Sequence, residues 1–281
     1  MKPDKIINVH THLKHRQNIA ERIKLWHDCN VVKTCIQVIP LAGYYTNDEM
    51  VKIIAEYAEM IMVFGHIDLG SDFNTQKSDF IPKIDQPDKI DWLKEQGFAG
   101  LKFTAPQYAY DDEIYFPLYE RAAALAMPIL FHTGNLAPNP SYSQKFTSQN
   151  KMRCIYLDSI GRAFPKLKMI MGHLGHPEYN IGLDITYTFK NIYGELSGHS
   201  GSQWRETELR KLFAPLAGAD MSNPLENQAL KFFEKICFGT DNPEPPVWIK
   251  LSQRLMDELE LPPELQERYW WKNAATILNL I

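Results

Sequence analysis

Residues 6–12 read Ile6-Ile7-Asn8-Val9-His10-Thr11-His12, and this stretch decides the fold. Its apolar start predicts a strand over Ile6–Val9, and two histidines follow at a spacing of two. Side chains two apart on a strand point the same way. His10 and His12 would therefore present two imidazoles together, which is half of a divalent metal site. An open, doubly wound sheet would carry Gly-X-Gly-X-X-Gly at this position instead.

Seven more short apolar runs follow, and amphipathic segments separate them. This alternation predicts a parallel sheet with helices outside it. Eight units in 281 residues fit an α/β fold, a (β/α)8 TIM barrel, as a single domain over residues 1–281. The expected strands are Ile6–Val9, Val32–Ile39, Ile61–Ile67, Ala99–Phe103, Pro128–His132, Lys168–Met171, Ile192–Leu196 and Ile236–Gly239. The expected helices are Ala20–Cys29, Asp48–Met60, Lys89–Gln96, Ile114–Ala126, Lys151–Phe164, Glu178–Phe189, Asn227–Lys235, Val247–Leu259 and Pro263–Leu280.

The long connections all follow strands rather than helices. Barrel enzymes build their active sites from the loops at the C-terminal ends of the strands. This asymmetry predicts one functional mouth, with active-site loops at that face. The long loops are expected at Leu13–Ile19, Asp68–Asp88, Asn135–Asn150 and Gly198–Glu226.

The composition limits the class of partner. A net charge of −4 and a pI near 6.1 give no reason to expect nucleic acid or an acidic membrane surface. No apolar segment has the design of a signal peptide or the length to span a bilayer. The four cysteines are scattered without a Cys-X-X-Cys pair. We therefore expect a reduced, cytoplasmic protein that acts on a small molecule.

Three more polar residues stand at the ends of later strands: His132, His173 and Asp241. Alternation along each strand predicts that His132 points inward with Leu130, His173 with Met169 and Met171, and Asp241 with Cys237. In the first strand it predicts that Ile7 and Val9 face the helices. All five polar groups would then meet at the mouth.

Each of these residues also has an ordinary interpretation. A lone histidine after an apolar run is most often a hydrogen-bonded core residue. Asp241, in Gly-Thr-Asp-Asn-Pro, equally suits a turn or a helix cap. Together the five residues favour a metal site, because chance must otherwise place them at the same end of four strands. Such a set suits Zn²⁺ first, and also Mn²⁺, Co²⁺ or Fe²⁺.

The same motifs, from Asn8-Val9-His10-Thr11-His12 to Phe238-Gly239-Thr240-Asp241-Asn242-Pro243, resemble the amidohydrolase superfamily. The closer resemblance is to its amidohydrolase-related (amidohydrolase 2) branch, which includes enzymes similar to aminocarboxymuconate-semialdehyde decarboxylase. The resemblance implies one catalytic divalent metal and a catalytic histidine at His173. It implies that the metal ligands are His10, His12, His132 and Asp241.

Lys102 has two interpretations. Binuclear members of the wider superfamily bridge two metals with a carboxylated lysine, often on the fourth strand, where Lys102 lies. The branch that this chain resembles does not use such a bridge. We therefore expect one metal, and a mouth lysine that pairs with an acid or a substrate anion.

Two reactions suit the implied site. In a hydrolase of an amide, ester or lactone bond, the metal activates a water, Asp241 transfers the proton and His173 stabilises the developing charge. In a decarboxylase of a small unsaturated or aromatic acid, Asp241 or His173 protonates the carbon that loses CO₂. We favour the hydrolase. A decarboxylase needs a cation for the carboxylate, and Arg16, Arg153 and Arg205 are candidates that equally suit solvated positions.

Other features leave alternatives open. His176 and His199 are as consistent with pocket residues as with loop residues. The cluster Tyr269-Trp270-Trp271 suits core packing better than a homodimer face, although a homodimer remains an interpretation. A barrel without catalysis is disfavoured because no implied ligand is missing. A serine hydrolase is disfavoured because the sequence has no Gly-X-Ser-X-Gly.

Overall fold

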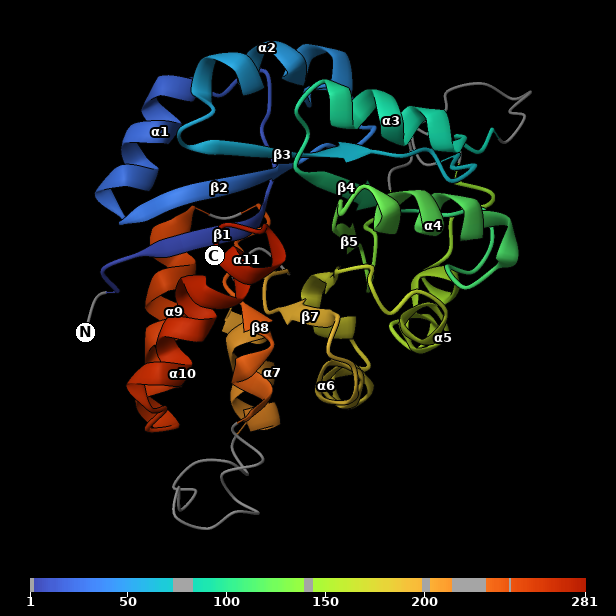
Figure 1. Ribbon diagram of the computed structural model, residues 1–281. Coiled ribbons are helices and arrows are strands. Elements are labelled where there is room, and N and C mark those ends of the chain that lie inside the picture. Colours follow the sequence, from blue (N-terminus) through green and yellow to red (C-terminus); the bar gives the residue numbers. More distant parts are fainter. Residues whose placement is uncertain (1–2, 73–82, 139–143, 199–202, 214–230, 243) are drawn as a thin grey trace.

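The computed structural model describes residues 3–72, 83–138, 144–198, 203–213, 231–242 and 244–281. Its eight strands form one sheet in the order β1 to β8, and every neighbouring pair is parallel (Figure 1). Each predicted strand is present, with ends that move by no more than two residues. The strands are β1 Ile6–Thr11, β2 Val31–Gln37, β3 Ile61–His66, β4 Gly100–Phe103, β5 Ile129–Phe131, β6 Met169–Met171, β7 Ile192–Glu195 and β8 Ile236–Cys237.

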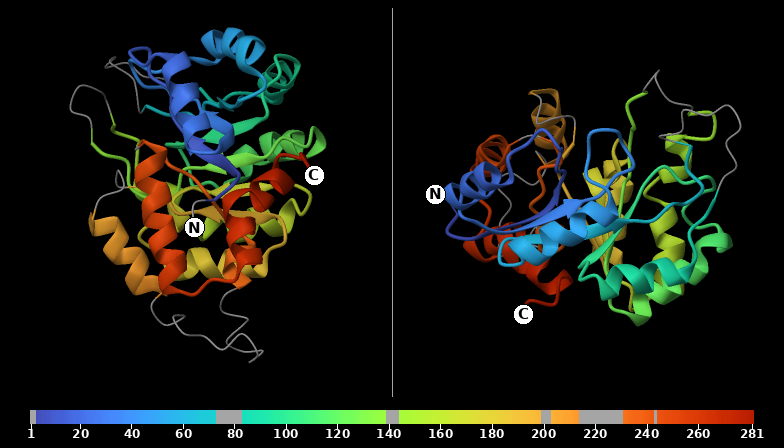
Figure 2. Two further views of the ribbon diagram at one scale, coloured as in Figure 1. Left: turned by 90° about the vertical axis from the view of Figure 1, so that its left-hand side faces the viewer. Right: turned by 90° about the horizontal axis from the view of Figure 1, so that it is seen from above.

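The first and last strands meet and nearly close the sheet. The amide of Val9 donates to the Phe238 carbonyl at 3.0 Å, and the amide of Thr240 donates to the His10 carbonyl at 2.9 Å. A parallel bridge pairs Thr11 with Asp241. The helices lie around the sheet, as the two views of Figure 2 show. The expected (β/α)8 barrel is confirmed. Its closure brings the His10-Thr11-His12 segment beside Asp241.

Local sequence signals explain where several helices begin. The Asn18 side chain accepts a hydrogen bond from the Ala20 amide at the start of α1, and Thr46 with Glu49 forms a capping box at α2. Proline occupies the first turn of α3, α4, α9 and α10. The helices are α1 Ile19–Asp28, α2 Asn47–Tyr57, α3 Pro87–Glu95, α4 Phe116–Ala124, α5 Tyr156–Ala163, α6 Tyr179–Thr188, α7 Gln203–Phe213, α9 Pro245–Glu258, α10 Pro263–Glu267 and α11 Asn273–Ile277.

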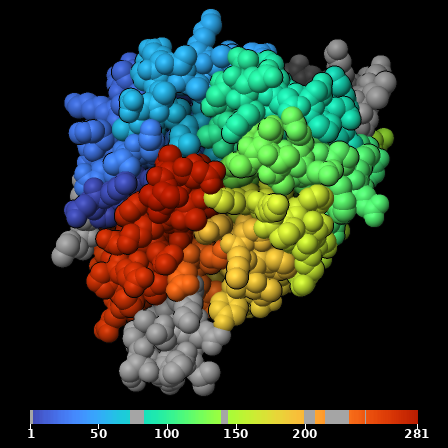
Figure 3. Space-filling model, in the orientation of Figure 1, coloured from blue at the N-terminus to red at the C-terminus, as the bar shows by residue number. Residues whose placement is uncertain are grey.

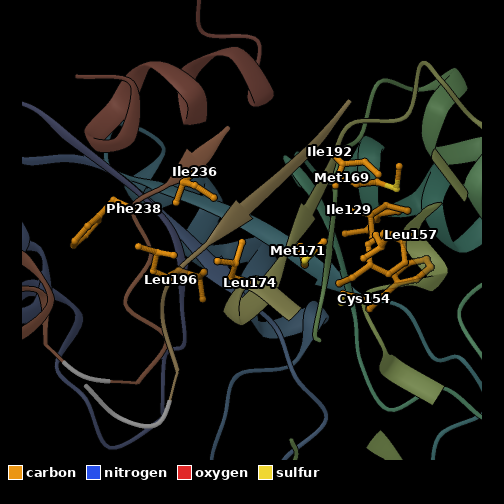
Figure 4. Packing of buried hydrophobic residues seen from close by; sticks show 14 of the residues in the cluster. Ile129, Cys154, Leu157, Met169, Met171, Leu174, Ile192, Leu196, Ile236 and Phe238 are labelled. Atoms are coloured by element: carbon orange, nitrogen blue, oxygen red, sulfur yellow. The ribbon is translucent and has the colours of Figure 1, made fainter. Parts of the chain in front are cut away.

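Two apolar clusters divide the core. The larger one fills the layer between strands and helices, and Figure 4 shows part of it around Met169, Met171 and Ile236. The smaller one fills the barrel interior, because seven of the eight strands contribute to it. Its fully or nearly buried members are Ile7, Val9, Cys35, Phe64, Leu130, Ile170, Tyr193, Cys237, Ala274, Ala275, Ile277 and Leu278.

Helix α11 closes the N-terminal end of the barrel. The Asn273 side chain donates to the carbonyl of Ile236, the first residue of β8, and Lys168, just before β6, donates to the Thr276 carbonyl. In Figure 3 the C-terminal segment, in red, occupies the middle of the face shown. Tyr269 and Trp270 are 1% and 3% exposed, which confirms core packing for these two residues.

Two strands present their side chains differently from the prediction. Ile7 and Val9 face the barrel interior, not the helices. The pairing of β1 with β2 is irregular between Asn8 and Thr11, where three steps on β1 match two on β2. This extra residue shifts the alternation, so His10 and His12 also reach the mouth. In β6, Met169 and Met171 face the helices and Ile170 faces inward.

One predicted loop and three predicted helices differ from the structure. The expected loop Gly198–Glu226 contains helix α7, whose apolar face was too weak to recognise beside charged residues. The expected helix Asn227–Lys235 is a 3₁₀ turn over Lys231–Glu234, and residues 227–230 lie outside the described part. Pro263–Leu280 divides into α10, a π-helical turn over Arg268–Lys272 and α11. Lys151–Phe164 divides into a 3₁₀ turn, Gln149–Met152, and α5.

Within the described ranges, no helix has the length and apolar character needed to cross a membrane. The four cysteines are all buried.

Candidate active site

Three of the predicted ligands meet where β1 and β8 end. Asp241 Oδ1 lies 3.2 Å from His12 Nε2 and 3.8 Å from His10 Nε2. Their ligand atoms all lie within 4.8 Å of one another. His10 is fully buried, whereas 14% of the Asp241 side chain is exposed. The group is therefore anchored in the protein but open to the mouth.

Hydrogen bonds behind the two imidazoles fix their orientation. His10 Nδ1 donates to Glu195 Oε1 at 3.0 Å, and His12 Nδ1 donates to the Gln37 carbonyl at 2.8 Å. Each Nδ1 is thus engaged, so each ring turns Nε2 toward Asp241. Metal-binding histidines are commonly held in this way by an acceptor on the other nitrogen.

His132 lines the same cavity from the end of β5. Its Nε2 atom is buried and has no hydrogen-bond partner among the described residues. It does not join the compact group of three within the same 4.8 Å limit. A buried nitrogen without a hydrogen-bond partner is unfavourable. A divalent metal bound beside it, next to two imidazoles and a carboxylate, would give this nitrogen a partner.

His173 reaches the mouth through a turn rather than through strand alternation. It follows β6 with a φ of +58°, and Leu174 follows with +48°. Left-handed backbone is uncommon for such residues and often marks functional sites. His173 Nδ1 donates to the Ser197 carbonyl at 2.9 Å, and its ring centroid lies 4.8 Å from that of His132. The inward position was predicted correctly, but for a reason that the structure contradicts.

A cavity of about 530 Å³ opens over these residues. Lys102 lies in its wall, 1% exposed, with Nζ 3.5 Å from His10 Nε2. His176 also lines the cavity. The outer wall, formed by the segments that follow β2 and β5, is mainly apolar, with Ile39, Leu41, Tyr44, Leu136, Ala137 and Pro138. The lining residues are His12, Ile39, Leu41, Tyr44, Lys102, Thr104, His132, Asn135, Leu136, Ala137, Pro138, His173, His176, Gly198, Asp241 and Asn242.

The candidate arginines do not gather in this cavity. Arg153 forms a two-pronged ion pair with Glu178, with Nε 2.9 Å from Oε1 and 3.1 Å from Oε2, and Arg16 is exposed. The Arg205 side chain and His199 lie outside the described part. Among the described lining residues, Lys102 is the cationic side chain placed to meet a substrate carboxylate.

Burial sets the protonation states of the site. It lowers the pKa of His10 from 6.5 to about 3, and the charge of Lys102 acts in the same direction. Burial likewise holds the pKa of His132 well below its usual value. Burial would raise the pKa of Asp241, but the His12 hydrogen bond and the nearby histidines hold it well below its usual range. Neutral imidazoles and an ionised carboxylate are the forms that bind a metal.

Glu195 was not predicted from the sequence as a residue of the site. This carboxylate ends β7, is fully buried, and contacts both His10 and the His173 backbone. The available signal was a single acidic residue in the apolar run Ile192-Tyr193-Gly194-Glu195-Leu196. Charged residues are almost never fully buried without a partner, so its place in a strand pointed to a polar neighbour inside the barrel.

Several solved structures share this fold. A probable 2-pyrone-4,6-dicarboxylic acid hydrolase from Acinetobacter baumannii has a TM-score of 0.62 at 11% identity, covering 98% of this chain and 99% of that one. A 2,6-dihydroxybenzoate decarboxylase has 0.62 at 15%, covering 100% and 99%. A 5-carboxyvanillate decarboxylase from Novosphingobium aromaticivorans, with bound manganese, has 0.57 at 13%, covering 92% and 80%. No curated protein matches the sequence.

Identities this low show the fold alone. The family is shown by a model described as Amidohydrolase, which matches residues 76–280 and thus most of the chain. Proteins of this family are metal-dependent enzymes, and the structural neighbours include both hydrolases and decarboxylases. The match begins after His10 and His12, so the place of these two rests on the barrel closure described above. The chain belongs to the amidohydrolase 2 family.

Proposed function

We propose that this protein is a hydrolase that uses one divalent metal, with Zn²⁺ as the first candidate, to cleave an amide, ester or lactone bond of a small molecule. The observation that carries the proposal is the position of Asp241. Its carboxylate lies within 3.8 Å of both His10 and His12, and it is partly open to the cavity. One group can therefore serve the metal and still reach a water beside it.

His10, His12, His132 and Asp241 would hold the metal. The metal, when bound, would supply a Lewis acid that polarises the substrate and makes a water acidic near neutral pH. Asp241, ionised in the fold, takes the proton from the attacking water and returns it to the leaving group. His173, held through Nδ1 by Ser197, turns Nε2 to the cavity and, when protonated, donates to the oxygen on which charge develops. Lys102 would bind a carboxylate of the substrate.

A decarboxylase of a small unsaturated or aromatic acid is the second candidate. The buried Lys102 and the apolar outer wall favour it, because they would hold the carboxylate and the body of such an acid. Two of the structural neighbours reported above are named decarboxylases of aromatic acids. In this reaction His173, when protonated, would give its proton to the carbon that loses CO₂.

The test begins with metal content. Protein purified without chelator is analysed for metal per chain, stripped, and reloaded with Zn²⁺, Mn²⁺ or Co²⁺. About one equivalent is expected. The loaded protein is then offered lactones, amides and esters while acid release is followed, and aromatic acids while CO₂ is followed. Metal-dependent acid release supports the hydrolase. CO₂ release alone would replace it with the decarboxylase, and a protein that takes up no metal would overturn both.

A further inference from the structure

The carboxylate of Glu195 lies between His10 on β1 and His173 in the turn after β6. Its side chain is 0% exposed. Oε1 accepts from His10 Nδ1 at 3.0 Å and from the His173 amide at 2.6 Å. Oε2 accepts from the Ser197 amide at 2.6 Å. One carboxylate thus contacts a predicted metal ligand on β1 and the turn after β6 that carries the predicted catalytic histidine.

The barrel leaves space for this carboxylate. A Cβ atom on Gly239 would lie 2.7 Å from Glu195 Oε2 and 3.2 Å from His10 Cβ. The first of these distances is shorter than real Cβ contacts allow. Gly239 has no left-handed backbone angle, so only this close approach requires glycine. Burying a carboxylate is strongly unfavourable unless hydrogen-bond donors satisfy its oxygens. Here three donors converge on it, so the burial is compensated.

We propose that Glu195 is a positioning residue of the metal centre. By accepting from Nδ1, it holds His10 in the tautomer whose Nε2 carries the free electron pair, directed to Asp241 and the metal position. By accepting from the His173 amide, it fixes the left-handed turn that brings His173 into the same mouth. The proposal rests on the proposed function, because it assigns Glu195 a role toward the metal that this function requires.

Glutamine separates this role from simple space filling. Glu195→Gln keeps the shape but offers one acceptor and one NH₂ donor, whereas all three partners are donors. With its oxygen toward His10, the NH₂ group would meet the Ser197 amide, donor against donor. With its NH₂ group toward His10, it would favour the tautomer that places the hydrogen on Nε2, where the metal binds. Either arrangement weakens the site.

The experiment titrates metal-free protein with Co²⁺ and follows both heat and the visible absorption of the bound ion, which reports its ligand geometry. We expect Glu195→Gln to bind Co²⁺ about 10- to 100-fold more weakly, with an altered spectrum. The matched control is Asp72→Asn. Asp72 is also a buried carboxylate (1% exposed), accepts from the Phe146 amide at 2.9 Å and the Thr147 hydroxyl at 2.8 Å, and stands outside the cavity lining. The Asp72→Asn variant should bind Co²⁺ as the wild type does.

Unaltered affinity and spectrum in Glu195→Gln would overturn the proposal while leaving the proposed function intact. No Co²⁺ uptake by the wild type would overturn the proposed function itself. If Glu195→Gln fails to fold, the tautomer is read directly in metal-free wild-type protein. Long-range ¹H–¹⁵N spectra of labelled histidines should show His10 protonated on Nδ1, with the signal assigned through its absence in His10→Gln. Protonation on Nε2 would contradict the proposal.

Discussion

The two ends of the barrel are built from opposite chemistry. At the N-terminal end, α11 buries Ala274, Ala275 and Ile277 against the apolar barrel interior. At the C-terminal end, the same strands finish in imidazoles and carboxylates around a cavity. The strands between them are only two to seven residues long. Fold stability and chemistry are therefore separated along each strand, and changes at one end should leave the property of the other end largely intact.

The sharpest test of this separation removes a ligand. His12→Ala should reduce bound metal well below one equivalent and bring activity to background, because the site loses one of three converging ligands. The melting temperature of the metal-free protein should hardly change, since the mouth is not where the apolar core lies. Metal analysis and metal-free thermal unfolding together test this expectation. Full metal occupancy in the variant would refute the assignment of His12.

The next largest effect is expected for His173→Ala. Its loss should lower kcat by about 10²–10⁴-fold, the range for a group that transfers protons or stabilises charge in the transition state. Bound metal should remain near one equivalent, because the proposed ligands are His10, His12, His132 and Asp241, whereas His173 belongs to a second candidate group with His10 and Glu195. Rate and metal content are measured on the same preparation. Loss of metal would show that His173 is a ligand and not a catalytic residue.

The closing helix provides the converse test. Ile277 is fully buried in α11, and Ile277→Ala should lower the free energy of unfolding by about 2–5 kcal/mol through lost burial and a cavity. Co²⁺ affinity should not change. Leu280→Ala, at a residue 44% exposed in the same terminal segment, is the control and should change stability by less than about 0.5 kcal/mol. A clear loss of metal affinity in Ile277→Ala would mean that the two ends are coupled.

The last prediction concerns the effect of pH on stability. The pKa of His10 falls from 6.5 in the unfolded chain to about 3 in the fold, and that of His132 falls as well. Below pH 6.5 the unfolded state therefore binds more protons, so metal-free protein loses stability as the pH drops toward 4. The slope is at most about 1.4 kcal/mol per pH unit for each histidine.

Urea unfolding at pH 7, 6 and 5 measures this slope. His132→Asn should flatten it, whereas His27→Asn, which removes an exposed histidine, should leave it unchanged. A stability that stays constant from pH 7 to 5 would show that neither buried histidine is held neutral by the fold.

The sequence predicted most of the architecture because the barrel repeats one simple pattern. Short apolar runs separated by amphipathic segments identified all eight strands, and the polar residues at their ends identified the mouth. The inward and outward faces were harder to predict. Strand alternation failed for Ile7 and Val9, because the extra residue in β1 leaves no mark in the sequence pattern. It failed for Met169 and Met171 because a left-handed turn redirects the next residues.

Glu195 and α7 were missed for different physical reasons. Glu195 acts through other residues, and the role of such a residue depends on contacts between strands that are distant in sequence. Helix α7 lies in a segment rich in charged residues, where apolar periodicity is weak. An isolated acidic residue in an apolar strand indicates a buried polar partner, and this rule identifies Glu195. Nothing comparable marks α7.

The irregular pairing in β1 has a consequence for protein engineering. Ile7 and Val9 pack in the barrel interior, whereas His10 and His12 point into the mouth, and the irregular pairing between Asn8 and Thr11 allows both. The extra residue changes the side-chain alternation of β1, so that core residues and histidines can both point inward. A designer who transplants the His-Thr-His segment onto a regular strand would turn either the core residues or the histidines the wrong way, so the graft must include residues 7–12 as one cassette.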